Sequence, residues 1–262
     1  MSARSWISRE EASSIDTLLF DLDDTLLTHG TLTRGAYDAL WSLHDAGVAL
    51  FAVTGRPSGW GEVVARQWPL QGVVAENGAV LIWRDNKAIV RSLRGSVESR
   101  ARDRSRLLSI VDEVGLELAD DNAARLTDVT FDIGEQVQVA RDRIDVARAL
   151  IDRRGARSIL SSVHLHATFE GDDKASGALR MLFERRGLDP ARARATVAFV
   201  GDSENDAACF TGFRRTFGVA NVARALPRLS IGPRWMTKGG MGEGFAELAA
   251  ALVSARENQP SP

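Results

Sequence analysis

The sequence predicts an α/β fold: a Rossmann-like parallel sheet core with helices on both faces, and an inserted α+β domain. Short apolar runs alternate with stretches of helical periodicity near both ends of the chain. Strands that alternate with helices in this way form parallel sheets through right-handed crossovers. The middle of the chain, about residues 90–170, differs because its strand-like segments alternate between apolar and polar residues. That alternation is typical of a sheet with one polar face, and therefore of a separate small domain.

Two strands and a helix open the predicted core. Residues 15–23 (IDTLLFDLD) and 48–55 (VALFAVTG) are continuous apolar runs, as expected for strands that are buried on both faces. Between them, residues 34–47 place Leu40 and Leu43 at helical spacing and end on a glycine. The order strand, helix, strand predicts the first crossover of the parallel sheet.

The rest of the core follows the same alternation. Residues 59–68 indicate a weaker helix, and residues 72–83 predict a strand, a turn at Asn77-Gly78 and a return strand. Towards the C-terminus the expected elements are a helix at residues 174–187, a strand and loop at 195–206, a strand at 212–221 and a helix at 242–256.

The domain boundaries follow from these patterns. In the inserted segment we expect helices at residues 96–114 and 137–155 and strands at 125–133 and 162–170. The predicted parts are a flexible N-terminal lead at residues 1–14, a core at 15–89 and 171–256, an inserted α+β domain at 90–170 and a disordered tail at 257–262.

Composition limits the classes of partner. The formal net charge of -2 gives no electrostatic reason to expect nucleic acid or an anionic membrane. No apolar stretch approaches the length of about 20 residues that a membrane span needs. The single cysteine, Cys209, cannot form an internal disulfide, and the N-terminal residues lack the apolar stretch of a signal peptide. We therefore expect a cytoplasmic protein, as a monomer or a homodimer.

Three of the predicted strands end in loops that carry reactive side chains: DLDDT (residues 21–25), VTGR (53–56) and GDSEND (201–206). In an open parallel sheet, ligands bind beyond the carboxyl ends of the strands. One acidic strand end alone is more often a turn or a helix cap. Three such ends at one edge of a sheet favour a functional site.

The acids at this edge indicate a hard cation. Asp21 and Asp23 are two residues apart, so in an extended chain they face the same side. Asp202 and Asp206 bring more negative charge to the same edge. Carboxylates this close repel one another unless a cation lies between them or one of them holds a proton. An all-oxygen ligand set favours Mg²⁺ over zinc.

Residues suited to a phosphate group accompany the acids. Thr54 offers a hydroxyl, Gly55 an accessible backbone N–H and Lys174 a positive charge. An aspartate nucleophile, Mg²⁺ and a phosphate clamp together describe phosphoryl transfer through an aspartyl-phosphate.

These motifs, in this order, resemble the four motifs of the haloacid dehalogenase superfamily. DLDDT is similar to the Asp-x-Asp-x-Thr signature of its phosphatases, followed by VTGRP, Lys174 and GDSEND. The inserted domain lies between the second motif and the lysine, as in the class IIB subgroup, whose members carry an α/β cap. The resemblance covers residues 15–256. AENGAVL (residues 75–81) and GGMGEGFAEL (239–248) are similar to segments of mannosyl-3-phosphoglycerate and sucrose-phosphate phosphatases.

The resemblance implies specific roles. Asp21 is the expected nucleophile, and Asp23 the acid that protonates the leaving oxygen and then the base that deprotonates water. Mg²⁺ is expected on the Asp21 carboxylate, the Asp23 backbone carbonyl and Asp202, with Asp206 beside the metal or beside the lysine. The residues expected to bind phosphate or substrate are Thr54, Gly55, Arg56, Asn77, Lys174 and Asn205.

Some positions have more than one interpretation. Arg56 could contact the substrate or pair with a neighbouring acid. Asn77 lies in an Asn-Gly turn, where a positive φ is its simplest role, and could also contact the leaving group. His164 and His166 share one face of a strand and could line the substrate pocket or be core histidines. Asp24 stands where many relatives have glycine, and either residue can offer its N–H to phosphate.

The resulting hypothesis is a Mg²⁺-dependent phosphatase that acts on a small phosphorylated metabolite, a sugar phosphate or a phosphoglycerate derivative. A phosphotransferase or phosphomutase on the same scaffold is an alternative, although the mutases have a fourth motif richer in glycine than GDSEND. A non-catalytic binding module is another alternative, and the presence of all four motif residues argues against it.

Overall fold

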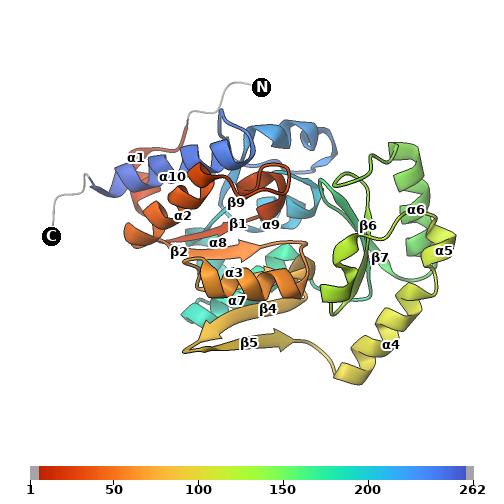
Figure 1. Ribbon diagram of the computed structural model, residues 1–262. Helices are drawn as coiled ribbons and strands as arrows, with labels where there is room; N and C mark the ends of the chain where they lie inside the picture. Colours follow the sequence, from red (N-terminus) through yellow and green to blue (C-terminus); the bar gives the residue numbers. More distant parts are fainter. Residues whose placement is uncertain (1–5, 258–262) are drawn as a thin grey trace.

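A computed structural model describes residues 6–257 as two parts, a large core and a smaller domain that we call the cap (Figure 1). The cap is formed by the middle of the chain, from α4 to β8, and lies at one end of the core sheet. The predicted fold class, an α/β core with an inserted α+β domain, is confirmed.

The core contains one eight-stranded sheet. Its strand order is β11-β10-β9-β1-β2-β3-β4-β5, and neighbouring strands are parallel from β11 to β3. Strands β4 and β5 continue the sheet as an antiparallel edge. The strands are β1 (Thr17–Phe20), β2 (Ala49–Val53), β3 (Gly72–Ala75), β4 (Val80–Asp85), β5 (Ala88–Leu93), β9 (Ala198–Gly201), β10 (Arg215–Gly218) and β11 (Trp235–Met236).

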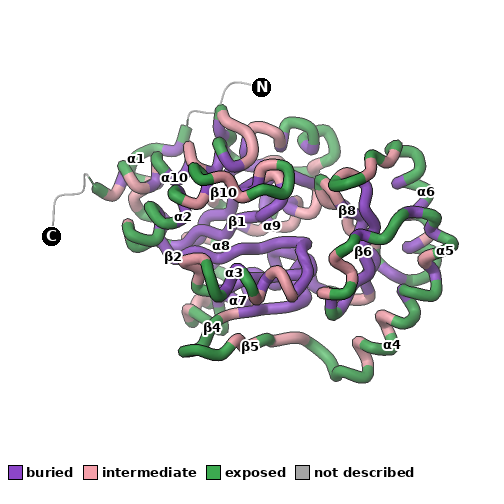
Figure 2. The backbone as a smooth tube through the Cα atoms, in the orientation of Figure 1, coloured by how far each residue is buried: buried purple, intermediate pink, exposed green. Residues whose placement is uncertain are grey.

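Helices cover both faces of this sheet because its strands are apolar on both sides. In β1, Leu18 and Phe20 pack into one hydrophobic cluster, while Leu19 between them packs into the other. The first cluster lies under α1 (Arg9–Ser13), α2 (Arg34–Asp45), α3 (Ser58–Gln67) and α10 (Met241–Glu257). The second lies under α7 (Lys174–Arg186), α8 (Pro190–Thr196) and α9 (Ala207–Gly212). Figure 2 shows the central strands as a continuous buried layer.

The cap is a three-stranded antiparallel sheet with helices on one face. The strand order is β6-β8-β7, with β6 (Asp128–Asp132), β7 (Arg157–Leu160) and β8 (His164–Thr168). Phe131 and Leu165 point into a hydrophobic cluster with α4 (Val97–Leu108), α5 (Val111–Val114) and α6 (Arg141–Arg153). The alternating residues on the other face are polar and include Thr130 and His166, both fully buried. The predicted polar face therefore exists, but it is not open to solvent.

Three boundaries differ from the sequence prediction. The expected flexible lead contains α1, whose N-cap is Ser8, and Ile7 and Ala12 are buried against the core. The predicted boundary between residues 89 and 90 falls inside β5, which pairs with β4 up to Leu93. Helix α10 includes Glu257, and the rest of the predicted disordered tail lies outside the described residues. Within residues 6–257, no helix is long and apolar enough to span a membrane.

Candidate active site

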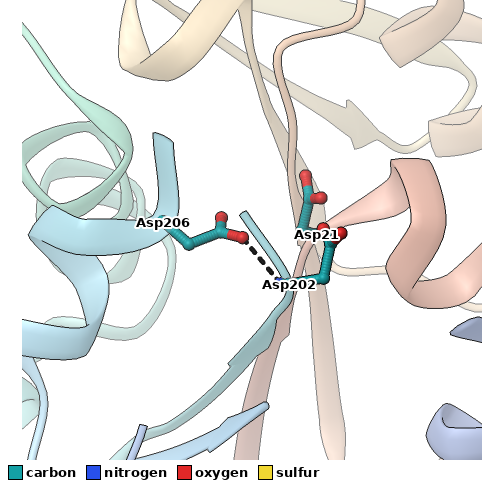
Figure 3. Close-up of side chains that lie close together, drawn as sticks. All are labelled: Asp21, Asp202 and Asp206. Atoms are coloured by element: carbon teal, nitrogen blue, oxygen red, sulfur yellow. Dashed lines mark hydrogen bonds between the residues drawn. The ribbon is translucent and has the colours of Figure 1, made fainter. Parts of the chain in front are cut away.

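The carboxyl ends of β1 and β9 place two aspartates beside each other. Asp21 directly follows β1, and its N–H donates to the carbonyl of Val200 in β9, at 3.0 Å. Asp202 directly follows β9. Figure 3 shows both carboxylates with that of Asp206, and each of the three side chains offers an oxygen within 4.8 Å of the other two. Only 3% of Asp21, 5% of Asp202 and none of Asp206 is exposed, so the group is shielded from water.

Lys174 joins this group from the start of α7. Its Nζ donates to Asp21 Oδ1 at 2.6 Å and to Asp206 Oδ1 at 2.7 Å, and its side chain is fully buried. Burial lowers the pKa of Lys174, but the attraction of Asp206 and Asp21 outweighs burial and raises it. Lys174 is therefore a fixed positive charge that orients the Asp21 carboxylate.

Hydrogen bonds hold both oxygen atoms of the Asp206 carboxylate in place. Its Oδ2 accepts the N–H groups of Asp202 at 2.9 Å and of Ser203 at 3.0 Å. A Cβ on Gly201 would lie 2.4 Å from the same oxygen, so this position excludes any larger residue. With one oxygen on Lys174 and the other on two backbone amides, Asp206 positions the loop after β9.

The group has the properties of a site for a hard cation. Burial raises the pKa of Asp21 to about 8 even though Lys174 opposes the shift. Burial and the charges of Asp21 and Asp206 also raise the pKa of Asp202. Three carboxylates and one lysine leave an excess of buried negative charge, which a divalent cation would offset. Their oxygen atoms fit Mg²⁺.

Two further side chains hold Asp202 in place. Its Oδ1 accepts the Thr25 hydroxyl at 3.2 Å, and its Oδ2 accepts Asn221 Nδ2 at 2.9 Å. Asn221 Nδ2 also donates to the carbonyl of Asp24 at 2.9 Å, so it ties the loops after β1 and β10 together. Asp24 itself has a φ of 54°, in the left-handed region. Glycine adopts this conformation without strain, which fits the resemblance that expects glycine at this position.

Asp23 faces a different partner. The chain turns after Asp21 into a helical turn over Leu22–Leu26, so the extended geometry assumed from the sequence is wrong beyond β1. The Asp23 carboxylate accepts three N–H bonds from Arg56 at 2.7–3.0 Å and lies outside the group of three aspartates. Of the four residues predicted to hold the metal, Asp23 could contribute only its backbone.

Arg56 connects Asp23 to the cap. Its Nη1 and Nη2 donate to Glu135 of the cap at 3.1 and 2.6 Å, and only 4% of its side chain is exposed. Burial lowers the pKa of Arg56, but Asp23 and Glu135 outweigh burial and raise it. Contact with His164 and the bond from Arg56 lower the pKa of Glu135 to about 2. The structure therefore supports the pairing interpretation of Arg56, with a carboxylate on each side.

The loop after β2 lies beside the loop after β3. The Thr54 carbonyl accepts the N–H of Asn77 at 3.0 Å, and the Thr54 hydroxyl accepts the N–H of Arg56 at 3.0 Å. Asn77 has a φ of 52°, as its Asn-Gly turn predicts, and its Oδ1 accepts Asn205 Nδ2 at 3.0 Å. Asn77 Nδ2 is buried and has no hydrogen-bond partner within the described chain. All ten predicted site residues thus lie in or directly around one site.

The polar face of the cap closes over Gly55. Arg125 of the cap donates to the Gly55 carbonyl at 2.9 Å and pairs with Asp128 at 3.1 Å. His166 Nδ1 lies 2.9 Å from both Asp128 Oδ2 and Thr130 Oγ1. A Cβ on Gly55 would lie 3.0 Å from His166 Nε2, so a larger residue would require the His166 ring to shift slightly.

A second contact between core and cap centres on Glu76. Its carboxylate accepts the N–H of Leu126 at 2.9 Å, and the N–H and hydroxyl of Thr127, both at 2.7 Å. Burial raises the pKa of Glu76, and the bonds from Thr127 oppose the shift. Glu76 therefore binds a loop of the cap through three hydrogen-bond donors. The resemblance of the AENGAVL segment did not predict this role.

The sequence analysis missed the residues that support the site. Asn221 ends a predicted strand and could have been found by the rule that identified the other loops. Arg125, Asp128 and Glu135 lie in or just after the predicted cap strand at residues 125–133, where the sequence analysis named no site residue. Only the fold shows that these residues face the core.

Comparison with known proteins agrees with this geometry. Residues 18–98 match the model of the haloacid dehalogenase-like hydrolase family. The match covers the part of the chain that carries the first two motifs. The chain is 28% identical over 245 residues to a phosphoglycolate phosphatase of Pyrobaculum neutrophilum, covering 90% of this chain and 95% of that protein.

Solved structures share the fold of the chain along nearly its whole length. A Thermoplasma acidophilum protein has a TM-score of 0.71 at 18% identity, over 91% of this chain and 98% of that one. A sucrose-phosphatase from Synechocystis, solved with sucrose and phosphate, has a TM-score of 0.61 at 17% identity, over 90% and 97%. At these identities the likeness concerns the fold, while the family model supports the predicted resemblance over residues 18–98.

Proposed function

We propose that this protein is a Mg²⁺-dependent phosphatase that hydrolyses a small phosphorylated metabolite through an aspartyl-phosphate on Asp21. One observation carries the proposal: the buried Asp21 carboxylate is held by Lys174 beside Asp202 and Asp206, at an edge where Thr54 and Gly55 also lie. A nucleophile, a cation site and a phosphate clamp therefore meet at one place.

The chemistry of the chain follows from these positions. A carboxylate oxygen of Asp21 attacks phosphorus, the bond from phosphorus to the leaving oxygen breaks, and a proton on Asp23 passes to that oxygen. Water then attacks the phosphorus of the aspartyl-phosphate and gives a proton to the Asp23 carboxylate. The bond to Asp21 breaks, which releases inorganic phosphate and restores both carboxyl groups.

Arg56 controls when Asp23 can act. Three N–H bonds from the Arg56 guanidinium occupy both oxygen atoms of the Asp23 carboxylate. The first step needs the protonated form, so Arg56 has to loosen its hold before Asp23 serves as an acid. Glu135 provides an alternative partner for the guanidinium.

Mg²⁺ would be held by the carboxylates of Asp21 and Asp202, with Asp206 close by. When bound, it supplies positive charge that offsets the carboxylates and the phosphoryl oxygens. Lys174 and the backbone N–H groups of the loops after β1 and β2 supply the remaining positive potential from the chain itself.

The substrate class that we propose is a sugar phosphate or a phosphoglycerate derivative. The named relatives act on different molecules, since one is a phosphoglycolate phosphatase and one was solved with sucrose and phosphate. The cytoplasm remains our proposal for the compartment, as does a monomer or a homodimer for the assembly. No contact among residues 6–257 specifically favours a phosphomutase or a non-catalytic module.

The test is the release of inorganic phosphate from p-nitrophenyl phosphate and from a panel of phosphorylated metabolites. Purified protein should be active with Mg²⁺, and the Asp21→Asn variant, which keeps the size of the side chain, should be inactive. Equal phosphate release by the wild type and Asp21→Asn would show that the activity does not depend on the proposed nucleophile.

A further inference from the structure

A cavity of about 310 Å³ lies between the core and the cap and reaches Asp202. The cap lines it with apolar side chains, including Ile133 and Leu160, and the core lines it with the loops after β9 and β10. Asp202 lines this cavity and belongs to the group of three aspartates, so the space adjoins the proposed cation site. Pockets for small molecules usually measure about 300–1,000 Å³, so the cavity is at the small end.

Three arginines from separate segments line the cavity: Arg141 of the cap, and Arg224 and Arg228 of the core. Arg141 Nη1 lies 3.2 Å from Glu204 Oε1, and Arg228 pairs with the same oxygen. One carboxylate therefore pairs with two guanidinium groups and links the cap to the core across the cavity, and Arg141 also pairs with Asp145 at 3.0 Å.

Arg224 differs from the other two. Within residues 6–257, its side chain has neither an ion pair nor a hydrogen bond. It lies in the helical turn Ala220–Arg224, three residues after Asn221, which is fixed by bonds to Asp24 and Asp202. Among the described residues, the acids that line the cavity are Asp24, Asp202 and Glu204, and Asp202 belongs to the proposed cation site. The exposed side chain of Arg224 therefore adds unpaired positive charge to the lining of the cavity.

We propose that this cavity binds the leaving-group end of the substrate and that this end carries an anionic group, a carboxylate or a second phosphate, paired with Arg224. This inference rests on the proposed function and narrows its substrate class. A guanidinium binds a carboxylate or a phosphate through two parallel N–H bonds, which a neutral hydroxymethyl group cannot accept. The size of the cavity suits a leaving group of a few carbon atoms.

The test compares three-carbon phosphoesters that differ at the far end. The probes are 3-phosphoglycerate, which carries a carboxylate, glycerol 3-phosphate, which carries a neutral hydroxymethyl group, and 1,3-propanediol bisphosphate. Each is assayed by phosphate release with the wild type, Arg224→Gln, Arg224→Lys and a matched control, Arg192→Gln. Arg192 is an exposed arginine of α8 that does not line the cavity.

The wild type should have a kcat/KM at least about 10-fold higher for one of the anionic probes than for glycerol 3-phosphate. Arg224→Gln should lower that value by roughly 10- to 100-fold, the usual worth of a hydrogen bond to a charged group. Most of the loss should appear in KM, because Arg224 would bind a part of the substrate that does not react. Arg224→Lys should recover part of it, and Arg192→Gln should match the wild type.

The outcomes separate the inference from the proposed function. The anionic probe that is preferred identifies the group as a carboxylate or a phosphate. If glycerol 3-phosphate is hydrolysed as well as both anionic probes, or if Arg224→Gln lowers all three equally, the inference is overturned while the phosphatase stands. If p-nitrophenyl phosphate is hydrolysed no better by the wild type than by Asp21→Asn, the proposed function fails, and the inference with it.

Discussion

Acidification should weaken this protein through one buried histidine, His166. Burial lowers the pKa of His166 from its usual 6.5 to about 4, although Asp128 opposes the shift. The other charged groups facing the ring are Arg125 and His164, and both lower the pKa further. His166 is therefore neutral in the folded protein at neutral pH. Its Nδ1 lies next to the ionised Asp128, so the proton is on Nδ1 and Nε2 faces Gly55 without one.

The sign and size of the effect follow from these two pKa values. Between pH 6.5 and pH 4 the unfolded chain binds a proton at this histidine and the folded protein does not, so the free energy of unfolding falls as pH falls. With 1.4 kcal/mol per pKa unit, the loss between pH 7.5 and pH 5 is about 2 kcal/mol. The full contribution is present above pH 6.5 and is lost as pH falls towards 4.

The assay is urea unfolding at a series of pH values, with His166→Asn as the matched variant. Asparagine keeps an N–H directed at Asp128 but cannot titrate, so the difference between the two proteins isolates the histidine from the other groups. The wild type should lose about 2 kcal/mol more than His166→Asn between pH 7.5 and pH 5. With four histidines in the chain, NMR of the ring nitrogens provides a second readout.

Parallel pH curves for the wild type and His166→Asn would refute this reasoning, because they would show that His166 is equally protonated in both states. An NMR titration of the folded protein with a His166 midpoint near 6.5 would refute it independently. Either result would mean that the cap does not bury this face of β8 in solution.

Three other perturbations test the site and the cap. EDTA should abolish phosphate release and Mg²⁺ should restore it, so full turnover without metal would contradict the metal site. Mg²⁺ should also raise the Tm of the wild type but not that of Asp202→Asn, because a ligand that binds only the folded state stabilises that state. Asp23→Asn should slow hydrolysis of an alkyl phosphate by roughly 10²- to 10⁴-fold. On p-nitrophenyl phosphate it should spare the first step, so that a rapid burst of p-nitrophenol is followed by slow turnover. An equal loss of rate on both substrates would argue against Asp23 as a general acid. Asp172 pairs with Arg94 and Arg180 at the links to the cap. Asp172→Asn should weaken both pairs and speed amide hydrogen exchange at residues 94–96 and 169–173. Unchanged exchange would show that these pairs do not restrain the cap.

The sequence predicted the core well because its signals are local. Continuous apolar runs such as residues 48–55 can only be strands buried on both faces, and the ends of parallel strands meet at one edge whatever their neighbours do. Among the elements that were missed, α8, β7 and β11 contain only 7, 4 and 2 residues. Segments this short carry too little periodicity to be detected.

The cap residues of the site could not be predicted, for a physical reason. Whether Asp128 is a surface acid or a buried partner of Arg125 depends on which part of the core lies against β6, and nothing in the local pattern encodes that contact. The prediction of a flexible N-terminal lead was wrong for the same reason. Ile7 and Ala12 are buried because this segment packs against α10, and no local pattern in the sequence predicts that contact.

Closure of the cap and the chemistry of the site depend on the same few residues. Gly55 belongs to the phosphate-binding loop, yet its carbonyl accepts the bond from Arg125 and its Cα lies under His166. Arg56, the next residue, holds the proposed acid Asp23 with one side of its guanidinium and the cap with the other. A movement of the cap that withdraws Glu135 would therefore leave Arg56 bound to Asp23 alone. All three N–H bonds from Arg56 would then stay on the Asp23 carboxylate, so an open cap would keep Asp23 from contact with a leaving group. In this arrangement the enzyme would cleave a phosphoester only after the cap has closed over it.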